Sequence, residues 1–113
     1  MKLKTLSIAM MGLAAPGLVA ADELIDMQKN ANNWVMPAGN YANQRYSELT
    51  QITKDNVKDL NMAWSFSTGV LRGHEGNALV IDGTMYVHTA FPNIVFALDL
   101  NNDGAIKWKY EPK

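Results

Sequence analysis

The spacing of hydrophobic and polar positions changes at about residue 61. Before it, apolar residues are scattered among turn formers; after it, short apolar runs alternate with turns rich in Gly, Asp and Asn. "NALVI" and "TMYVHT" flank Asp82-Gly83, a two-residue turn that strongly favours a β-hairpin. "NIVFALDL" and "AIKWKY" form a second predicted strand pair turned at Asn101 to Gly104, and "NMAWSFST" is predicted to be a further strand. The pattern therefore predicts a meander of short antiparallel strands from residue 61 to residue 113.

The register of the first hairpin follows from its turn, because opposite residues are counted outward from Asp82-Gly83. The predicted pairs are Ile81–Thr84, Val80–Met85, Leu79–Tyr86, Ala78–Val87 and Asn77–His88. Both faces of this hairpin are largely apolar, whereas a sheet with one wet face should alternate apolar and polar residues. We therefore expect both faces to be covered, and a partner sheet to lie outside these 113 residues.

Two short helices are predicted before residue 61. Asp22 is expected to cap a helix over "ADELIDMQKNA", which the asparagines at 30, 32 and 33 end. Thr53 is expected to cap a second helix over "TKDNVKDL", with Val57 and Leu60 facing inward.

The stretch "WVMPAGNYANQRYSEL" between these helices is predicted to be irregular, because Pro37, Gly39 and the asparagines favour turns. Its aromatic residues Trp34, Tyr41 and Tyr46 are expected to anchor it against a core.

The first 21 residues have the layout of a secretory signal peptide. Lys2 and Lys4 precede an apolar run, Pro16-Gly17 interrupts its end, and the small residues Ala20 and Ala21 offer cleavage sites. A membrane anchor is the alternative, but the apolar run is shorter than the roughly 20 residues that a span needs. We therefore expect a secreted protein with a signal peptide over 1–21, a helix and loop segment over 22–60, and strands over 61–113.

Composition excludes several function classes. The chain has 10 basic and 11 acidic residues and no basic patch, which argues against nucleic-acid binding. It has no cysteine, which excludes disulfides, thiolate metal sites, cysteine nucleophiles and a lipoprotein anchor within this sequence.

The segment Gly73-His74-Glu75-Gly76, directly ahead of the first hairpin, is the strongest candidate for chemistry. The two glycines can permit unusual backbone angles and close approach to a ligand. Glu75 is either a solvated turn residue or a carboxylate held out for a ligand. His74, Glu75 and His88 could also form a two-histidine, one-carboxylate metal site, but such a set is common by chance. We expect His88 to be a core or cross-strand residue instead.

The other polar and aromatic candidates have structural interpretations. Asp99 and Asp103 are expected to be turn residues, and Trp34, Trp64 and Trp108 are expected to be core anchors.

The second strand pair, "ALDLNNDGAIKWKY", resembles the tryptophan-docking repeat of quinoprotein β-propellers. Ala97, Asp99, Gly104 and Trp108 match the repeat, in which the Trp ring bridges to the next blade. The Gly-to-Trp spacing fits, but the Asp-to-Gly spacing is one residue longer than usual, which predicts a slightly enlarged turn. Any hairpin with a buried Trp is the alternative interpretation.

Taken with "NWVMPAGNYANQRYSEL" and "GVLRGHEGNALVIDGTMYVHT", the chain is similar to the N-terminal part of the large subunits of methanol and related alcohol dehydrogenases that use pyrroloquinoline quinone (PQQ). It is most similar to their lanthanide-dependent branch. Asn77, Ala90 and Ile94 depart mildly from the pattern of the family.

The resemblance implies an all-β fold, the first part of an eight-bladed quinoprotein β-propeller preceded by short helices and an irregular N-terminal segment. It implies oxidation of a primary alcohol to an aldehyde by PQQ above a calcium or lanthanide ion. It also implies electron transfer to a periplasmic cytochrome c, and an oligomer at full length.

Carried over by position, the glutamate that reaches the quinone in the family is Glu75. Its carboxylate can accept a hydrogen bond from the ring N–H of PQQ or share a proton with an acid group of PQQ. The resemblance places the catalytic residues and the metal ligands outside these 113 residues, so the fragment alone is expected to be inactive. Two alternatives stay open: a secreted non-catalytic β-propeller used for binding or assembly, and a quinoprotein that acts on another alcohol or a sugar.

Overall fold

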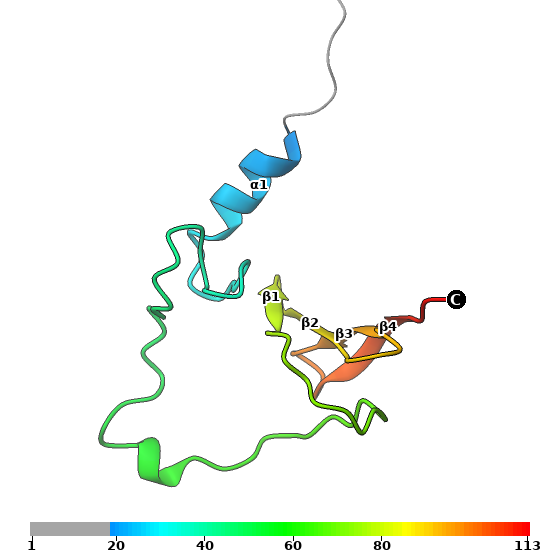
Figure 1. Ribbon diagram of the computed structural model, residues 1–113. Coiled ribbons are helices and arrows are strands. Elements are labelled where there is room, and N and C mark those ends of the chain that lie inside the picture. Colours follow the sequence, from blue (N-terminus) through cyan, green and yellow to red (C-terminus); the bar gives the residue numbers. More distant parts are fainter. Residues whose placement is uncertain (1–18) are drawn as a thin grey trace, which may run out of the picture.

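The structure is a computed structural model that describes residues 19–113, with side chains from Glu23 onward. Its centre is one antiparallel sheet whose four strands follow the order of the chain (Figure 1). These strands are β1 (Leu79–Ile81), β2 (Thr84–His88), β3 (Val95–Asp99) and β4 (Ala105–Tyr110). Helix α1 (Val19–Met27) and the short 3₁₀ helix η1 (Val57–Asp59) precede the sheet. A four-stranded antiparallel meander is the unit from which propeller blades are built, so the predicted all-β class is confirmed.

The first hairpin has the predicted turn and register. Asp82 and Gly83 have φ angles of 47° and 70°, the two positive values that a type I′ turn requires. The pairs Ile81–Thr84, Val80–Met85 and Leu79–Tyr86 are confirmed. The two outermost predicted pairs are wrong, because β1 begins only at Leu79 and the chain before it leaves the sheet. There the Asn77 side-chain amide donates to the Pro37 carbonyl oxygen at 3.4 Å.

The second hairpin also forms as predicted. Its turn is enlarged, as the spacing indicated, and the Gly104 N–H donates to the Asp99 carbonyl oxygen at 2.9 Å to close it. Ala97 lies directly opposite Trp108, and the register then shifts so that Leu98 faces Ile106. Lys107 is left as the extra residue of a β-bulge.

One face of the sheet is covered by the chain's own segment 64–70. Ile94, Phe96 and Leu98 are buried there, and Trp64, Phe66, Val70, Met85 and Val87 pack against them. The Phe66 ring meets the Phe96 ring edge-on, with centroids 5.0 Å apart.

The predicted strand over 61–68 is therefore wrong as secondary structure. Its alternation is real, since Trp64, Phe66 and Thr68 are partly buried between exposed neighbours. The segment contributes side chains to the face of the sheet, however, and has no backbone pairing with any described strand.

The opposite face remains only partly covered. Ala97 is fully buried at its centre, and the rings of Tyr86 and Trp108 meet beside it with centroids 5.9 Å apart. Trp108 is still 47% exposed, so within the described residues it is not the core anchor that we expected. The face that carries Phe96 is thus covered without a partner sheet. The face that carries Trp108 still has room for one.

Helix α1 begins three residues earlier than the proposed cap. Asp22 lies within the helix, so its predicted capping role is wrong, and Ala20 and Ala21 belong to the same helix. Ala residues are strong helix formers, which explains the extension. The remainder of the predicted signal peptide, 1–18, lies outside the described residues. Over 19–113, no helix combines the length and apolar character that crossing a membrane requires.

The helix ends at Met27, and hydrogen-bonded turns follow through the asparagines, as predicted. The next segment is attached to the edge of β1. The Trp34 N–H donates to the Val80 carbonyl at 2.7 Å and the Val80 N–H donates back to the Trp34 carbonyl at 3.0 Å. Trp34 thus joins the loop to the sheet through its backbone, while its partly buried ring lies against Gly39 and outside the core cluster, so the predicted core anchoring is not confirmed. Tyr41 and Tyr46 are not anchors, because both side chains are exposed.

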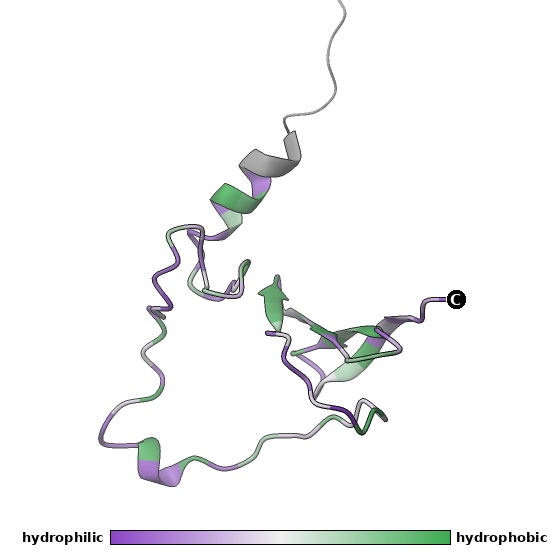
Figure 2. Cartoon of the chain, viewed as in Figure 1, coloured by the Kyte–Doolittle hydropathy of each residue, from purple (hydrophilic) through white to green (hydrophobic). Residues whose placement is uncertain are grey.

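From about residue 41 to residue 63 the chain forms an arm that runs away from the sheet and returns, with η1 near its far end (Figure 1). Apolar positions recur along this arm (Figure 2). Val57 and Leu60 are 49% and 58% exposed, so the prediction that they face inward is wrong. No other described helix or strand packs against η1, so nothing in this part of the chain covers these side chains.

Candidate functional site

The Gly-His-Glu-Gly segment contributes to a hollow of about 530 Å³ at one end of the sheet. Its lining residues come from the strands and from two loops: Leu79, Tyr86, Val87, His88 and Val95, with Pro37, Glu75, Gly76 and Asn77. Small-molecule sites usually have volumes of roughly 300–1,000 Å³, apolar walls and few polar groups. The hollow has these properties.

Glu75 is the carboxylate of this hollow. Its side chain is exposed, and neither of the two ion pairs found among residues 23–113 includes it. A carboxylate without a cationic partner can accept hydrogen bonds from a ligand N–H. The geometry therefore fits the ligand-binding interpretation of Glu75.

Residue 76 is a glycine for a different reason from the one expected. Neither Gly73 nor Gly76 has a positive φ, so unusual backbone angles are not the reason for either glycine. A β-carbon at Gly76 would overlap the imidazole ring of His88. A β-carbon at Gly73, in contrast, would meet no atom within 4 Å. A group does approach Gly76 closely, but it is the His88 ring, so close approach to a ligand stays a prediction.

His74 is held by its own loop. Its Nδ1 lies 2.8 Å from the Arg72 carbonyl oxygen and its Nε2 lies 3.2 Å from the Thr68 hydroxyl oxygen. The carbonyl can only accept, so Nδ1 carries the proton and donates. In the neutral ring Nε2 then accepts from Thr68.

The candidate metal site is not assembled. Within the described part of the chain, no three His, Cys, Asp or Glu side chains lie where they could hold one ion, and this includes His74, Glu75 and His88. The His74 ring is hydrogen-bonded to Thr68 and Arg72. The His88 ring lies against Gly76, the residue that follows Glu75. His88 is exposed, so it is not a core residue, but it is the cross-strand residue that was the other expectation, since it pairs with Val95 of β3.

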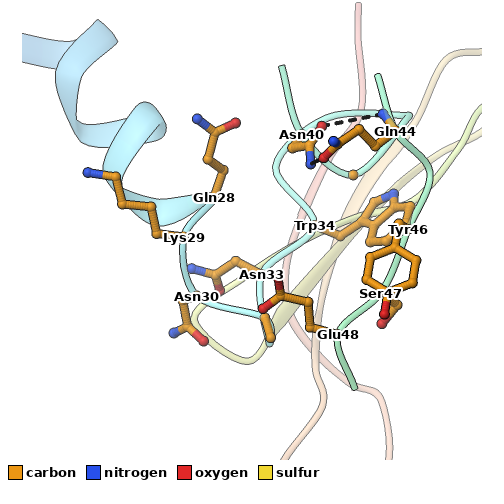
Figure 3. A pocket seen from close by; sticks show the side chains of 12 residues that line it. Gln28, Lys29, Asn30, Asn33, Trp34, Asn40, Gln44, Tyr46, Ser47 and Glu48 are labelled. Carbon is orange, nitrogen blue, oxygen red and sulfur yellow. Dashed lines mark hydrogen bonds between the residues drawn. The ribbon is translucent and has the colours of Figure 1, made fainter. Parts of the chain in front are cut away.

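Two other hollows lie near the N-terminal loop. One, of about 650 Å³, lies between that loop and the two hairpin turns, and Trp34, Leu49, Val80 and Leu100 are among its apolar walls. The other, of about 120 Å³, lies between the end of α1 and residues 39–48 (Figure 3). Two of its amide side chains bond to each other, since Asn40 donates to the Gln44 side-chain oxygen at 3.0 Å. It is below the usual size of a cofactor site.

The contact between Gly76 and His88 was missed by sequence reasoning. A signal for it was present, because the counted register set Asn77 opposite His88, one residue from Gly76. Periodicity gives the register of strands but not the contacts of a chain that leaves the sheet, so the ring contact could be found only in three dimensions.

Comparison with known proteins identifies relatives over almost the whole chain. Residues 34–113 match the family described as glucose/ethanol/alcohol dehydrogenase, β-propeller domain, of the PQQ type. The chain is 57% identical over 108 residues to a lanthanide-dependent methanol dehydrogenase of Methylacidiphilum fumariolicum, covering 88% of this chain and 18% of that protein. It is 53% identical over 111 residues to methanol dehydrogenase [cytochrome c] subunit 1 of Methylobacterium organophilum, covering 95% of this chain and 18% of that protein.

A solved structure is also similar. A europium-containing methanol dehydrogenase superposes with a TM-score of 0.76 at 60% identity, covering 81% of this chain and 16% of that one. The chain therefore spans less than a fifth of the length of the relatives that it matches.

Proposed function

Because this chain belongs to the PQQ-type family of glucose, ethanol and alcohol dehydrogenase β-propellers, we propose that it forms part of a periplasmic PQQ-dependent dehydrogenase that oxidises primary alcohols to aldehydes. The observation that carries the proposal is the hollow beside Glu75, at one end of the four-stranded sheet. All four strands lie within the residues that match the family. Methanol is the favoured substrate, since the two relatives compared above at 53% and 57% identity are both named methanol dehydrogenases.

Glu75 is the residue of this chain that we assign to the cofactor. PQQ is a planar tricarboxylic quinone, and when bound it would take up two electrons from the alcohol in the form of one hydride. The Glu75 carboxylate would accept a hydrogen bond from its ring N–H or share a proton with one of its acid groups. The apolar side chains of Leu79, Tyr86 and Val95 would exclude water from the adjoining wall.

We assign neither a catalytic role nor a metal-ligand role to any residue of this chain. We propose that a calcium or lanthanide ion accompanies PQQ in the complete enzyme, because relatives are named lanthanide-dependent and europium-containing. Such an ion would act as a Lewis acid. A cytochrome c is the proposed electron acceptor, as the name of one relative includes it. An oligomeric full-length enzyme is part of the same proposal.

The proposal is tested by Glu75→Gln in the full-length enzyme, with PQQ titrated into the apoenzyme and followed by absorbance. Losing one hydrogen bond to a charged group should weaken PQQ binding on the order of tenfold to hundredfold. Glu111→Gln is the matched control. Glu111 pairs with Lys109 at 2.8 Å on the surface, where an ion pair contributes little. Unchanged PQQ affinity and alcohol oxidation in Glu75→Gln would remove Glu75 from the cofactor site.

A further inference from the structure

His88 occupies the space that a side chain at residue 76 would need. It is the last residue of β2, and its backbone is paired with Val95 of β3. This strand pairing fixes the position of the His88 Cα and Cβ atoms, from which the imidazole ring extends. The ring lies against Gly76, and both residues line the hollow that Glu75 borders. A side chain fixed in a sheet thus touches the residue next to the proposed cofactor ligand.

Glu75 is held on both sides in the sequence. On its N-terminal side, His74 is bonded to the Arg72 carbonyl and the Thr68 hydroxyl. On its C-terminal side, Gly76 rests on His88, and the Asn77 amide donates to the Pro37 carbonyl. The described residues give the Glu75 carboxylate no ion pair of its own. The backbone that these neighbours hold sets the position of the Glu75 Cα atom, and so the region that the carboxylate can reach.

We propose that His88 is a positioning residue for Glu75: the imidazole ring supports the backbone of residue 76 and so directs the Glu75 carboxylate into the hollow. This inference rests on the proposed function, since it takes Glu75 as a PQQ ligand. It explains why residue 76 is Gly although its φ is ordinary. When a residue fixed in a sheet holds a cofactor-binding side chain in place beforehand, less conformational entropy is lost as the cofactor binds.

The experiment uses the full-length enzyme and a cycle of Gly76→Ala, His88→Ala and the double variant. PQQ dissociation constants are measured on apoenzyme well below the melting temperature of each variant, and the induced circular dichroism of bound PQQ is recorded. Gly73→Ala is the matched control, because its new methyl group meets nothing within 4 Å and its φ is not positive.

Gly76→Ala should weaken PQQ binding on the order of tenfold to hundredfold, because the methyl group and the His88 ring cannot share one place. His88→Ala should weaken it about threefold to tenfold through lost preorganisation. In the double variant the methyl group enters the space that the ring leaves, so binding should be tighter than in Gly76→Ala alone. The induced dichroism should change in Gly76→Ala and recover in the double variant.

Additive losses in the double variant would overturn the proposal, since they would mean that His88 contacts PQQ directly or acts elsewhere. Melting temperatures that fall while PQQ affinity stays constant would also overturn it and leave a purely structural contact. Glu75→Gln separates these results from failure of the proposed function. If Glu75→Gln weakens PQQ binding and the cycle shows no coupling, the role of His88 fails while that of Glu75 stands.

Discussion

Asn33 is the residue that joins the N-terminal loop to the sheet. It is only 7% exposed, and its side-chain amide donates at 3.2 Å to the carbonyl oxygen of Met27, the last residue of α1. Its side-chain oxygen accepts from the Asp82 N–H at 3.0 Å, in the turn of the first hairpin. One buried amide therefore satisfies a helix end and also a strand turn that is 49 residues from Asn33 in sequence.

Asn33→Ala in the full-length enzyme should loosen the turn between β1 and β2. Leaving a buried donor or acceptor unpaired costs about 1–3 kcal/mol, so hydrogen exchange around Asp82 should become about fivefold to 150-fold faster. Asn32→Ala is the control, because the Asn32 amide is exposed and bonds only to Asn30. Exchange mass spectrometry of peptides from this turn measures the effect. Equal protection in the two variants would contradict it.

The element that determines the packing of the sheet is the extended segment 64–70. Its Trp64 ring lies over the turn of the second hairpin, where a β-carbon on Gly104 would come within 2.6 Å of Trp64 Cζ3. Gly104 is buried and has a φ of 74°. The turn glycine of the docking repeat thus has two functions, since it closes the turn and it receives an aromatic ring from a distant segment.

Gly104→Ala and Gly69→Ala separate these two functions. Both glycines have positive φ, 74° and 72°, but a β-carbon on Gly69 meets nothing within 4 Å. Gly69→Ala should cost only the strain of the backbone, about 1 kcal/mol, whereas Gly104→Ala should cost about 1–3 kcal/mol more through overpacking. Denaturant unfolding of the full-length enzyme, followed by tryptophan fluorescence, measures the difference. Equal losses in the two variants would mean that the Trp64 contact contributes nothing.

At the scale of the whole molecule, the arm over 41–63 lines hollows with the N-terminal loop only as far as Leu49, and its residues 50–63 are exposed throughout. The large apolar side chains of the arm are exposed: Tyr41, Tyr46, Leu49, Ile52, Val57, Leu60 and Met62. Exposed apolar side chains in such number on one segment indicate an interface. The relatives are more than five times longer than this chain, which is consistent with an arm that is covered in the complete protein.

We expect residues 22–113, expressed alone, to bind a hydrophobic dye and to form heterogeneous aggregates, whereas the full-length enzyme should bind no dye and form only a defined oligomer. Val57→Ser with Leu60→Ser should reduce dye binding by the isolated chain, because these two side chains are exposed on and beside η1. Lys54→Ser with Lys58→Ser is the matched control on the same stretch. Size-exclusion chromatography and dye fluorescence are the measurements. A monomeric chain without dye binding would show that the arm is already covered.

Local chemistry accounts for what could be predicted from sequence. Asp82-Gly83 predicted the first hairpin and its register, because Asp-Gly between two apolar runs favours a type I′ turn. Both residues have the positive φ angles that this turn needs, and the register follows from it. Ala97, Gly104 and Trp108 match positions of the docking repeat that have specific steric requirements, and the longer matching stretches, including the Gly-His-Glu-Gly segment, indicated the family. The alternation at Trp64 and Phe66 was read correctly as one buried side, but periodicity cannot distinguish a paired strand from an extended chain on a sheet.

The amino-acid sequence by itself determined the two hairpins, the all-β class and the family, and it made Glu75 a candidate cofactor residue, because these inferences depend on residues close together in the chain or on matched motifs. Only the tertiary structure decided what lies against what. It placed Trp64 on Gly104, joined Asn33 to Asp82 and put the His88 ring against Gly76. Contacts between distant segments depend on the shape of the packed chain, and the space that a missing β-carbon leaves can be assigned only when its neighbour is known.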